Sequence, residues 1–356
     1  MNQKPLVIRD LVAKIPVIQG GMGVGVSLYN LAGAVAKCGG IGILSTAQIG
    51  YQEPGFDENP IETNLKAMEN YIKKAKEIAE GGIIGVNIMV ATKNYEAYVR
   101  TAAHAGADLI ISGAGLPVSL PSMIEGSKTK IAPIVSSVKS AAVIMKLWDR
   151  KYKCCPDLVV IEGPKAGGHL GFSYEELAHI TKEEYELEIK NIIQEVKPYR
   201  EKYGYDIPIV VAGGIYDGAD MAQALSLGAD GVQVGTRFVT TYECDASNAY
   251  KEAYLKAEKK DIEIVKSPVG MPGRAIHNAF IERTLQENPG VKKCHQCLER
   301  CNHKDIPYCI TDALLNAVKG NLDDGLIFCG ENAWRSHKME RVEDIMKEFS
   351  QVKTTI

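Results

Sequence analysis

The chain has 356 residues, 46% of them hydrophobic, which is enough for one large core or two modest ones. Charged residues make up 24% and the formal net charge is −3, so the composition shows no basic footprint for nucleic acid. The N-terminal sequence lacks the layout of a signal peptide, and no run of about 18 apolar residues could span a bilayer. We therefore expect a cytoplasmic protein with neither a nucleic-acid nor a membrane partner.

Eight short apolar runs follow one another along the chain, and polar or glycine-rich turns come after most of them. Each run is near-continuously apolar rather than alternating, as expected for strands that are buried on both faces. The runs occupy residues 16–20, 41–44, 83–88, 108–112, 131–135, 157–162, 207–212 and 231–235.

Most intervals between the runs are long enough for a helix, and residues 30–37 and 218–227 are rich in alanine and leucine. Strand and helix repeated eight times predict an α/β fold of the closed (β/α)8 type, a TIM barrel. A doubly wound open sheet is the alternative, but eight units in one chain favour closure.

Two stretches exceed what a barrel needs. After the sixth run, Thr181 and Glu184 have the spacing of a capping box, and residues 185–196 carry apolar side chains at helical spacing. We interpret this helix as part of an enlarged loop above the site. We interpret residues 241–356 as a C-terminal extension that packs on a barrel of residues 1–240, rather than as an independent domain.

Glycine residues gather after the predicted strands, at the end where a barrel of this kind carries its site. Gly21 follows the first strand, Gly213 and Gly214 follow the seventh, and Gly235 follows the eighth. Glycine lets backbone N–H groups approach phosphate oxygens, so the loops after strands seven and eight are predicted to bind phosphate. Ordinary turn glycines are the alternative for any one of these positions.

The catalytic candidate is His169, which follows the sixth strand. An imidazole can move protons near neutral pH. Gly167, Gly168 and Gly171 surround it and would leave the ring open to a ligand. A structural or surface role is the alternative for a single histidine.

The cysteines form a second feature. The chain has nine, and an odd number without a secretion signal argues against a disulfide framework. Four thiolates at short spacing suit a [4Fe–4S] cluster or a tetrahedral zinc ion, and a loop without metal stays open as a third reading. His295 and His303 are further candidates for zinc. The four clustered cysteines are Cys294, Cys297, Cys301 and Cys309.

Several segments together resemble the nitronate monooxygenase and 2-nitropropane dioxygenase family, which is related to the flavin enoyl-acyl-carrier-protein reductases II. The resemblance covers about residues 5–280, and its motifs are specific for the superfamily rather than for a substrate. The segments are residues 16–23 (PVIQGGMG), 166–169 (AGGH), 211–215 (VAGGI), 231–238 (GVQVGTRF) and 267–275 (SPVGMPGRA).

The resemblance implies FMN at the barrel mouth, with Gly21 and Met22 against the isoalloxazine and Asn87 in contact with the cofactor. Family members often carry glutamate before the AGGH motif, whereas this chain has Lys165, so the substrate preference is left open. The cofactor-binding residues that the resemblance implies are Gly21, Met22, Asn87, Gly168, Gly213, Gly214, Gly235 and Thr236.

The resemblance also implies an FMN-dependent monooxygenase that oxidises alkyl nitronates, with His169 as the acid–base residue and oxygen completing the reaction. The alternative is an NAD(P)H-dependent enoyl-thioester (enoyl-ACP) reductase, and a second alternative is a flavin electron-transfer protein. A flavin that could exchange electrons favours iron–sulfur over zinc at the cysteine cluster. The expected partner is a small-molecule substrate, while NAD(P)H as a co-substrate and a homo-oligomer stay open.

Overall fold

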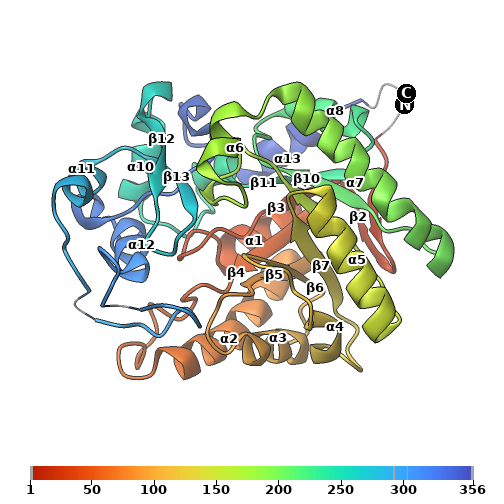
Figure 1. The fold of residues 1–356 in the computed structure, drawn as a ribbon, viewed down its shortest axis with the longest axis horizontal. Coiled ribbons are helices and arrows are strands. Elements are labelled where there is room, and N and C mark those ends of the chain that lie inside the picture. The colour runs from red at the N-terminus through yellow and green to blue at the C-terminus, as the bar shows by residue number, and fades with distance from the viewer. Residues whose placement is uncertain (1–2, 292, 303, 354–356) are drawn as a thin grey trace.

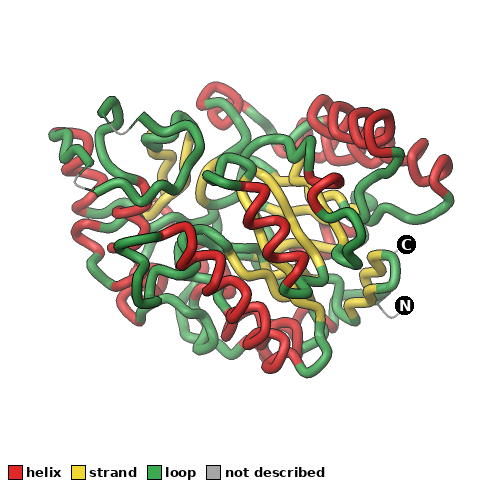
Figure 2. Tube along the Cα trace, turned by 90° about the horizontal axis from the view of Figure 1, so that it is seen from below, coloured by secondary structure: helices red, strands yellow, loops and turns green. Residues whose placement is uncertain are grey.

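The computed structural model of the protein describes residues 3–291, 293–302 and 304–353. Eight parallel strands close into a barrel in the order β10-β11-β3-β4-β5-β6-β7-β8 (Figures 1 and 2). The eight predicted strands and the closed TIM barrel are confirmed, and the pairing of β11 with β3 excludes an open sheet. The strands are β3 (Val17–Gln19), β4 (Ile41–Ser45), β5 (Ile83–Met89), β6 (Leu109–Gly113), β7 (Lys130–Val135), β8 (Val159–Glu162), β10 (Ile209–Ala212) and β11 (Gly231–Val234).

A ring of helices surrounds the barrel. The helices predicted over residues 30–37 and 218–227 are present as α1 and α8. Side-chain caps start several of them, since Asn59 accepts from the Glu62 N–H before α2 and Asp217 accepts from the Asp220 N–H before α8. The ring consists of α1 (Tyr29–Lys37), α2 (Pro60–Ala79), α3 (Tyr95–His104), α4 (Leu120–Met123), α5 (Val138–Tyr152), α7 (Lys182–Tyr203), α8 (Gly218–Ser226) and α13 (Val342–Ser350).

The helix after Thr181 belongs to this ring, which corrects its predicted place in the loop above the site. The predicted capping box is formed, because Glu184 Oε2 accepts from the Thr181 N–H at 2.8 Å and Thr181 Oγ1 accepts from the Glu184 N–H at 3.2 Å. Its apolar face, however, packs on α5 and enters the main core. The enlarged loop after β8 therefore spans residues 163–181 and holds only β9 (Gly168–His169) and the short α6 (Tyr174–His179).

Apolar side chains fill the inside of the barrel, and a hairpin closes its amino-terminal end. The hairpin pairs β1 (Leu6–Ile8) with β2 (Leu11–Ala13) in antiparallel fashion. Leu6 and Ile8 are buried in one cluster with inward-facing residues of the barrel such as Ile41 and Val160. The amino-terminal end is thus sealed, which leaves the carboxyl-terminal end of the strands for a ligand.

The predicted extension of residues 241–356 divides into two parts. Helix α13 at its end contacts both α1 and α8, so it takes the place of the eighth barrel helix. The Gly218 N–H donates to Glu348 Oε1 at 3.2 Å, which ties α13 to the start of α8. The segment between β11 and α13 is therefore inserted between the last strand of the barrel and its helix.

This inserted segment carries its own small sheet and helices, on the left in Figure 1. Strand β13 pairs with β12 and also with β9 of the loop after β8, with Gly273 opposite His169. Its elements are α9 (Thr236–Val239), α10 (Asn248–Lys256), β12 (Ile262–Lys266), β13 (Pro272–Ile276), α11 (Ala279–Gln286), α12 (Ile310–Lys319) and 3-10 turns at Lys259–Asp261, Leu322–Asp324 and Ala333–Arg335.

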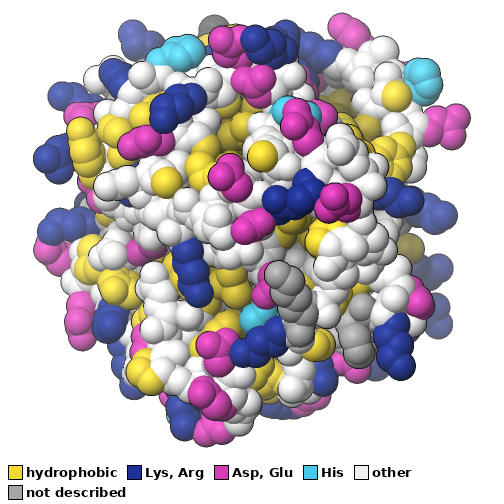
Figure 3. All heavy atoms as spheres, turned by 90° about the vertical axis from the view of Figure 1, so that its left-hand side faces the viewer, with side chains coloured by type: hydrophobic (Ala, Val, Ile, Leu, Met, Phe, Trp, Pro, Cys, Tyr) yellow, Lys and Arg dark blue, Asp and Glu magenta, His cyan; other side chains and the backbone are white. Residues whose placement is uncertain are grey.

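The surface of the inserted segment is seen in Figure 3, where acidic and basic side chains are interspersed. Across the described residues, no helix has both the length and the apolar character needed to cross a membrane.

Candidate active site and cysteine cluster

Three polar side chains face inward at the carboxyl-terminal end of the barrel. Side chains alternate between the inside and the outside along each strand. Ile83 and Val160 belong to the inner cluster, so Asn87 on β5 and Glu162 on β8 face inward as well. Gln233 on β11 joins them, because a Cβ at Gly20 would lie 3.2 Å from its Cγ. These side chains form the floor of a polar mouth above an apolar interior.

The turn after β3 crosses this mouth at close range. A Cβ at Gly21 would lie only 2.4 Å from the Cβ of Asn87, so no larger residue fits there without a shift. Met22 lies beside the loop after β11, since a Cβ at Gly235 would be 3.4 Å from the Met22 Sδ. Gly21, Met22, Asn87 and Gly235, which the resemblance linked to FMN, are thus brought together.

The loops after β10 and β11 present unpaired backbone donors. Gly213 and Gly214 have φ angles of 91° and 86°, a left-handed conformation that favours glycine. Within the part of the chain that the structure describes, the N–H groups of Gly213, Gly214, Gly235 and Thr236 donate to no protein acceptor. Buried or enclosed N–H groups normally have a partner, so these donors fit a phosphate group.

A segment of the insertion, residues 329–335, holds these two loops in place. The Gly330 N–H donates to Thr236 Oγ1 at 3.1 Å, and Asn332 Nδ2 donates to the Gly214 carbonyl at 2.7 Å. The Thr236 hydroxyl is therefore engaged by protein, whereas its backbone N–H is not. No sequence pattern indicated that residues so far along the chain would contact the loops after β10 and β11.

Lys165, at the position where the family often has glutamate, contacts the same segment. Its Nζ lies 3.4 Å from Glu331 Oε1, and its carbonyl accepts from the Glu331 N–H at 3.2 Å. An exposed ion pair of this kind contributes only about 0–1 kcal/mol. Lys165 thus helps to join the 163–181 loop to the insertion.

His169 lies in β9, between the barrel and the insertion. Its Nε2 is 2.7 Å from Ser267 Oγ, and its ring packs edge-on against Phe328 at 4.9 Å between centroids. Burial lowers the pKa of His169 to about 4, because the protein cannot solvate the imidazolium ion. The ring is therefore neutral at pH 7 and can accept a proton. The AGGH motif and the segment beginning at Ser267, which are about a hundred residues apart, meet at this hydrogen bond.

Two polar atoms at the mouth are buried without a hydrogen-bond partner. They are the Tyr185 hydroxyl and Gln233 Oε1. Tyr185 projects from α7 toward the end of β8, where a Cβ at Gly163 would lie 2.4 Å from its oxygen. Burial also raises the pKa of the neighbouring Glu162 to about 7. Buried polar atoms are normally paired, so these groups fit a site that a polar ligand completes.

Glu162→Gln is expected to stabilise the flavin-free protein more at pH 8 than at pH 5. The folded-state pKa of Glu162 is raised to about 7 from an ordinary 4.5, so the folded chain binds the extra proton between these pH values. Stability is therefore lost as the pH rises through this window, and glutamine removes that loss. Thermal unfolding at the two pH values checks this, with a difference of a few degrees expected, since ~1 kcal/mol shifts Tm by about 2–4 °C. Equal shifts in Tm would contradict the raised pKa.

The four clustered cysteines line one cavity of about 240 Å³ beside the barrel. Cys297 is close enough to Cys294, Cys301 and Cys309 to interact with each electrostatically. Cys309 is the N-cap residue of α12, so its thiol lies at the start of this helix. The four cysteines that are close in the sequence thus also lie together in the structure, at a place separate from the barrel mouth.

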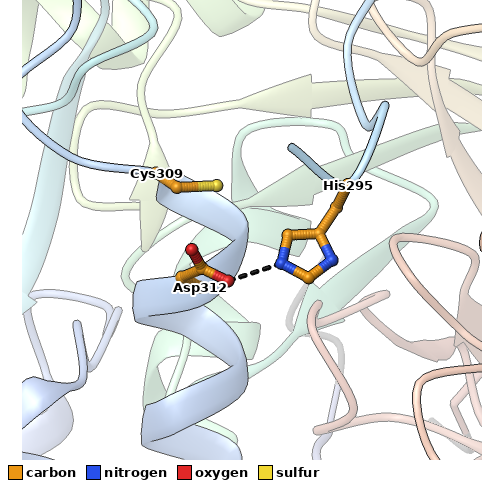
Figure 4. A group of neighbouring side chains, drawn as sticks. All are labelled: His295, Cys309 and Asp312. Carbon is orange, nitrogen blue, oxygen red and sulfur yellow. Dashed lines mark hydrogen bonds and ion pairs between the residues drawn. The ribbon is translucent and has the colours of Figure 1, made fainter. Parts of the chain in front are cut away.

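His295, the other predicted zinc candidate, lies next to this cavity. Its Nε2 is 2.5 Å from Asp312 Oδ1, with Cys309 on the same turn of α12, as Figure 4 shows. Its Nδ1 is buried without a partner, and in Figure 4 it points away from Asp312 and Cys309. His303, the second histidine candidate, lies outside the described residues.

Sequence reasoning missed several groups at the mouth. Glu162 and Gln233 are the single charged or amide side chains at or near the ends of otherwise apolar strands, and that signal could have found them. Tyr185 and Asn332 had no local signal, because each reaches the site through contacts between segments far apart in the sequence. Ser267 begins a segment of the family resemblance, but nothing in that segment indicated its contact with His169.

Comparison with known proteins gives the family. A family model described as nitronate monooxygenase matches residues 5–351. With the barrel and the glycine-lined mouth, this match supports an oxidoreductase of the FMN-dependent class. The chain belongs to the nitronate monooxygenase family.

Three similar proteins illustrate the range of the relatives. A "probable nitronate monooxygenase" of Staphylococcus aureus (strain Newman) is 24% identical over 307 residues, 80% of this chain and 82% of the relative. A Rhodococcus jostii enzyme, "(3aS,4S,5R,7aS)-5-hydroxy-7a-methyl-1-oxo-octahydro-1H-indene-4-carboxyl-CoA dehydrogenase", is 26% identical over 75% of this chain, but the match spans only 64% of its own length. The structure of FabK from Thermotoga maritima superposes with a TM-score of 0.72 at 24% identity, over 95% of this chain and 92% of FabK, which supports the fold.

Proposed function

We propose that the protein oxidises alkyl nitronates, with FMN held at the barrel mouth and His169 as the acid–base residue. The observation that carries this proposal is the neutral, partly buried His169 in a loop that packs against the glycine turn with unpaired N–H groups after β10. Gly213 is where the two meet, because a Cβ there would lie 3.0 Å from the Ala166 nitrogen of the histidine loop.

The residues of the mouth fit FMN in two respects. The N–H groups of Gly213, Gly214, Gly235 and Thr236 would hold its phosphate, and Gly21, Met22, Gly168 and Asn87 would hold the flavin ring. The unpaired oxygens of Tyr185 and Gln233 are available to its polar edge. When bound, FMN supplies the electron acceptor that no side chain of the protein offers.

When the substrate arrives as the neutral nitroalkane, His169 would take the proton from the carbon that bears the nitro group and so form the nitronate that is oxidised. A base must be unprotonated at working pH, and the lowered pKa of His169 meets this requirement. Ser267 fixes the ring through Nε2, and Phe328 limits its tilt. Oxygen is the second substrate in this proposal.

A second candidate is the oxidation or reduction of an acyl thioester, with NAD(P)H as the partner of the flavin. It is favoured by the Rhodococcus relative, whose name specifies a carboxyl-CoA dehydrogenase. In the reductive direction His169 would donate a proton as the imidazolium ion, and its lowered pKa disfavours that form at neutral pH. This observation ranks the nitronate reaction first.

Anaerobic mixing of the purified protein with a simple alkyl nitronate, and separately with NADH and NADPH, tests the proposal. We expect the nitronate alone to bleach the flavin absorbance, and heat-released cofactor to run as FMN on chromatography. FAD would contradict the assigned phosphate loops, since this chain has no dinucleotide fingerprint after its first strand. Rapid bleaching by a nicotinamide but not by nitronate would favour the thioester reaction, and bleaching by neither would favour an electron-transfer protein.

A further inference from the structure

We propose that Cys294, Cys297, Cys301 and Cys309 bind a [4Fe–4S] cluster beside the barrel, as a second redox centre in addition to the flavin site. The four side chains come from one loop and from the start of α12, and they line one cavity. Four thiolates are the usual ligand set of such a cluster.

The size of the cavity is the first argument. Its volume of about 240 Å³ is several times the ~30 Å³ that one water molecule occupies in the liquid, so it has room for much more than a single ion. Cys297 lies centrally, within electrostatic reach of the other three thiols.

The spacing of the sulfur atoms is the second argument. A zinc ion with Zn–S bonds of about 2.3 Å draws its four sulfur atoms to within about 3.8 Å of one another. Among the residues that the structure describes, no three of these cysteines have their sulfur atoms within 4.8 Å of one another. A four-iron cluster binds one thiolate at each iron and so holds them further apart. The open arrangement therefore favours a cluster over a zinc ion.

The third argument is the pattern of unpaired buried atoms. Four buried side-chain atoms of the described chain have no hydrogen-bond partner, and two of them, at Tyr185 and Gln233, belong to the barrel mouth. The other two are His295 Nδ1 and Thr92 Oγ1. Both lie in or against the loop that carries Cys294, Cys297 and Cys301, which we call the cysteine loop. His295 is only 5% exposed and lines the cavity itself. The barrel mouth and the cysteine cavity thus each contain buried polar atoms without a partner, as expected where a bound ligand completes the site.

The cysteine loop packs against the barrel and does not contact the inserted segment alone. Leu298 forms an antiparallel bridge with Thr92, the Lys93 N–H donates to the Cys297 carbonyl at 3.1 Å, and the Glu299 N–H donates to the Ala91 carbonyl at 2.9 Å. Residues 90–94 directly follow β5, the strand that carries Asn87 of the barrel mouth. The cluster would therefore lie on the same end of the barrel as the flavin.

A single metal ion at His295, Cys309 and Asp312 is the alternative that the geometry offers. Their ligand atoms lie within 4.8 Å of one another. However, His295 Nε2 and Asp312 Oδ1 are already paired at 2.5 Å, and the unpaired Nδ1 points away from the other two residues (Figure 4). The pair is thus better explained as support for the cysteine loop.

Metal analysis of the anaerobically purified holoenzyme tests the proposal. We expect about four iron and four acid-labile sulfide per chain, the content of one [4Fe–4S] cluster, and an electron paramagnetic resonance signal after reduction with dithionite. Zinc without sulfide, or no iron even after anaerobic reconstitution with iron and sulfide, would overturn it. These readings come from the wild type, so they do not depend on how any variant folds.

Two variants locate the cluster. Cys297→Ala should remove most of the iron and the resonance signal, whereas Cys38→Ser, at the free cysteine that ends α1, should leave both unchanged. Asp312→Asn should also retain the cluster, and loss of all metal in this variant would point to the single-ion site instead. Flavin content is measured in the same samples, so failure of the cluster proposal is distinguished from failure of the proposed function.

Discussion

Replacement of His169 by alanine is expected to slow turnover of the best neutral nitroalkane substrate by about 10²–10⁴-fold, the usual range for a lost acid–base group. The side chain touches the protein through Ser267 and Phe328, while its backbone pairs with Gly273, so alanine removes the imidazole and leaves the strand pairing. FMN should stay bound. Steady-state rates and flavin content measured on the same preparation check both expectations.

The pH profile separates a base from a proton donor at His169. With a pKa of about 4, the imidazole is neutral above about pH 5, so a rate that needs the base is independent of this group there and falls only in more acidic solution. A rate that needs the imidazolium would instead fall as the pH rises above 4. Ser267→Ala, which removes the hydrogen bond to Nε2 but keeps the imidazole, should cost much less than His169→Ala. An equal loss in the two variants would mean that His169 acts only as a structural residue.

The barrel could be predicted because each of its strands has a local signal in the sequence. A parallel strand buried on both faces needs a continuous apolar run, and eight such runs were visible in order. The pairing of β9 with β13 could not be predicted, because it joins Gly168 and His169 to Arg274 and Gly273 across about a hundred residues. For the same reason, the sequence did not reveal that α13 returns to complete the helix ring after the long insertion.

The residues of the candidate site also fall into two groups: those that the local sequence indicates and those that only tertiary contacts bring to the site. Gly21, Gly213 and Gly214 could be found because a glycine at a strand end marks close approach of the backbone. Asn332 could not be found, since its contact with Gly214 exists only once the 329–335 segment has folded back over the barrel. The capping box at Thr181 was predicted correctly, but the predicted place of its helix above the site was wrong. A cap indicates where a helix begins and not which layer of the fold it joins.

Gly213→Ala is expected to weaken FMN binding by about 10–100-fold. Its φ of 91° is strained for any residue with a Cβ, and that Cβ would lie 3.0 Å from the Ala166 nitrogen and from the Gly163 carbonyl oxygen. Both neighbours are backbone atoms, which cannot rotate away as a side chain can. The flavin-free variant can relax out of this conformation, so FMN binding has to restore a strain of order 1–3 kcal/mol, and each 1.4 kcal/mol changes a dissociation constant tenfold. Titration of the flavin-free variant with FMN, followed by flavin fluorescence, measures the change.

Two matched variants show whether the effect belongs to the phosphate loop. Gly204→Ala introduces a Cβ at a φ of 70° with no atom within 4 Å and lies at the end of α7, so it should leave FMN affinity unchanged whatever it does to stability. Gly214→Ala has nearly the same φ as Gly213, but its Cβ would lie 3.0 Å from the Lys165 Cβ and 3.1 Å from the Lys165 Cδ, so a change of the Lys165 rotamer relieves part of the contact and no backbone atom is involved. We therefore expect it to lose less affinity than Gly213→Ala. Wild-type FMN affinity in Gly213→Ala would contradict the assignment of this loop to the flavin site.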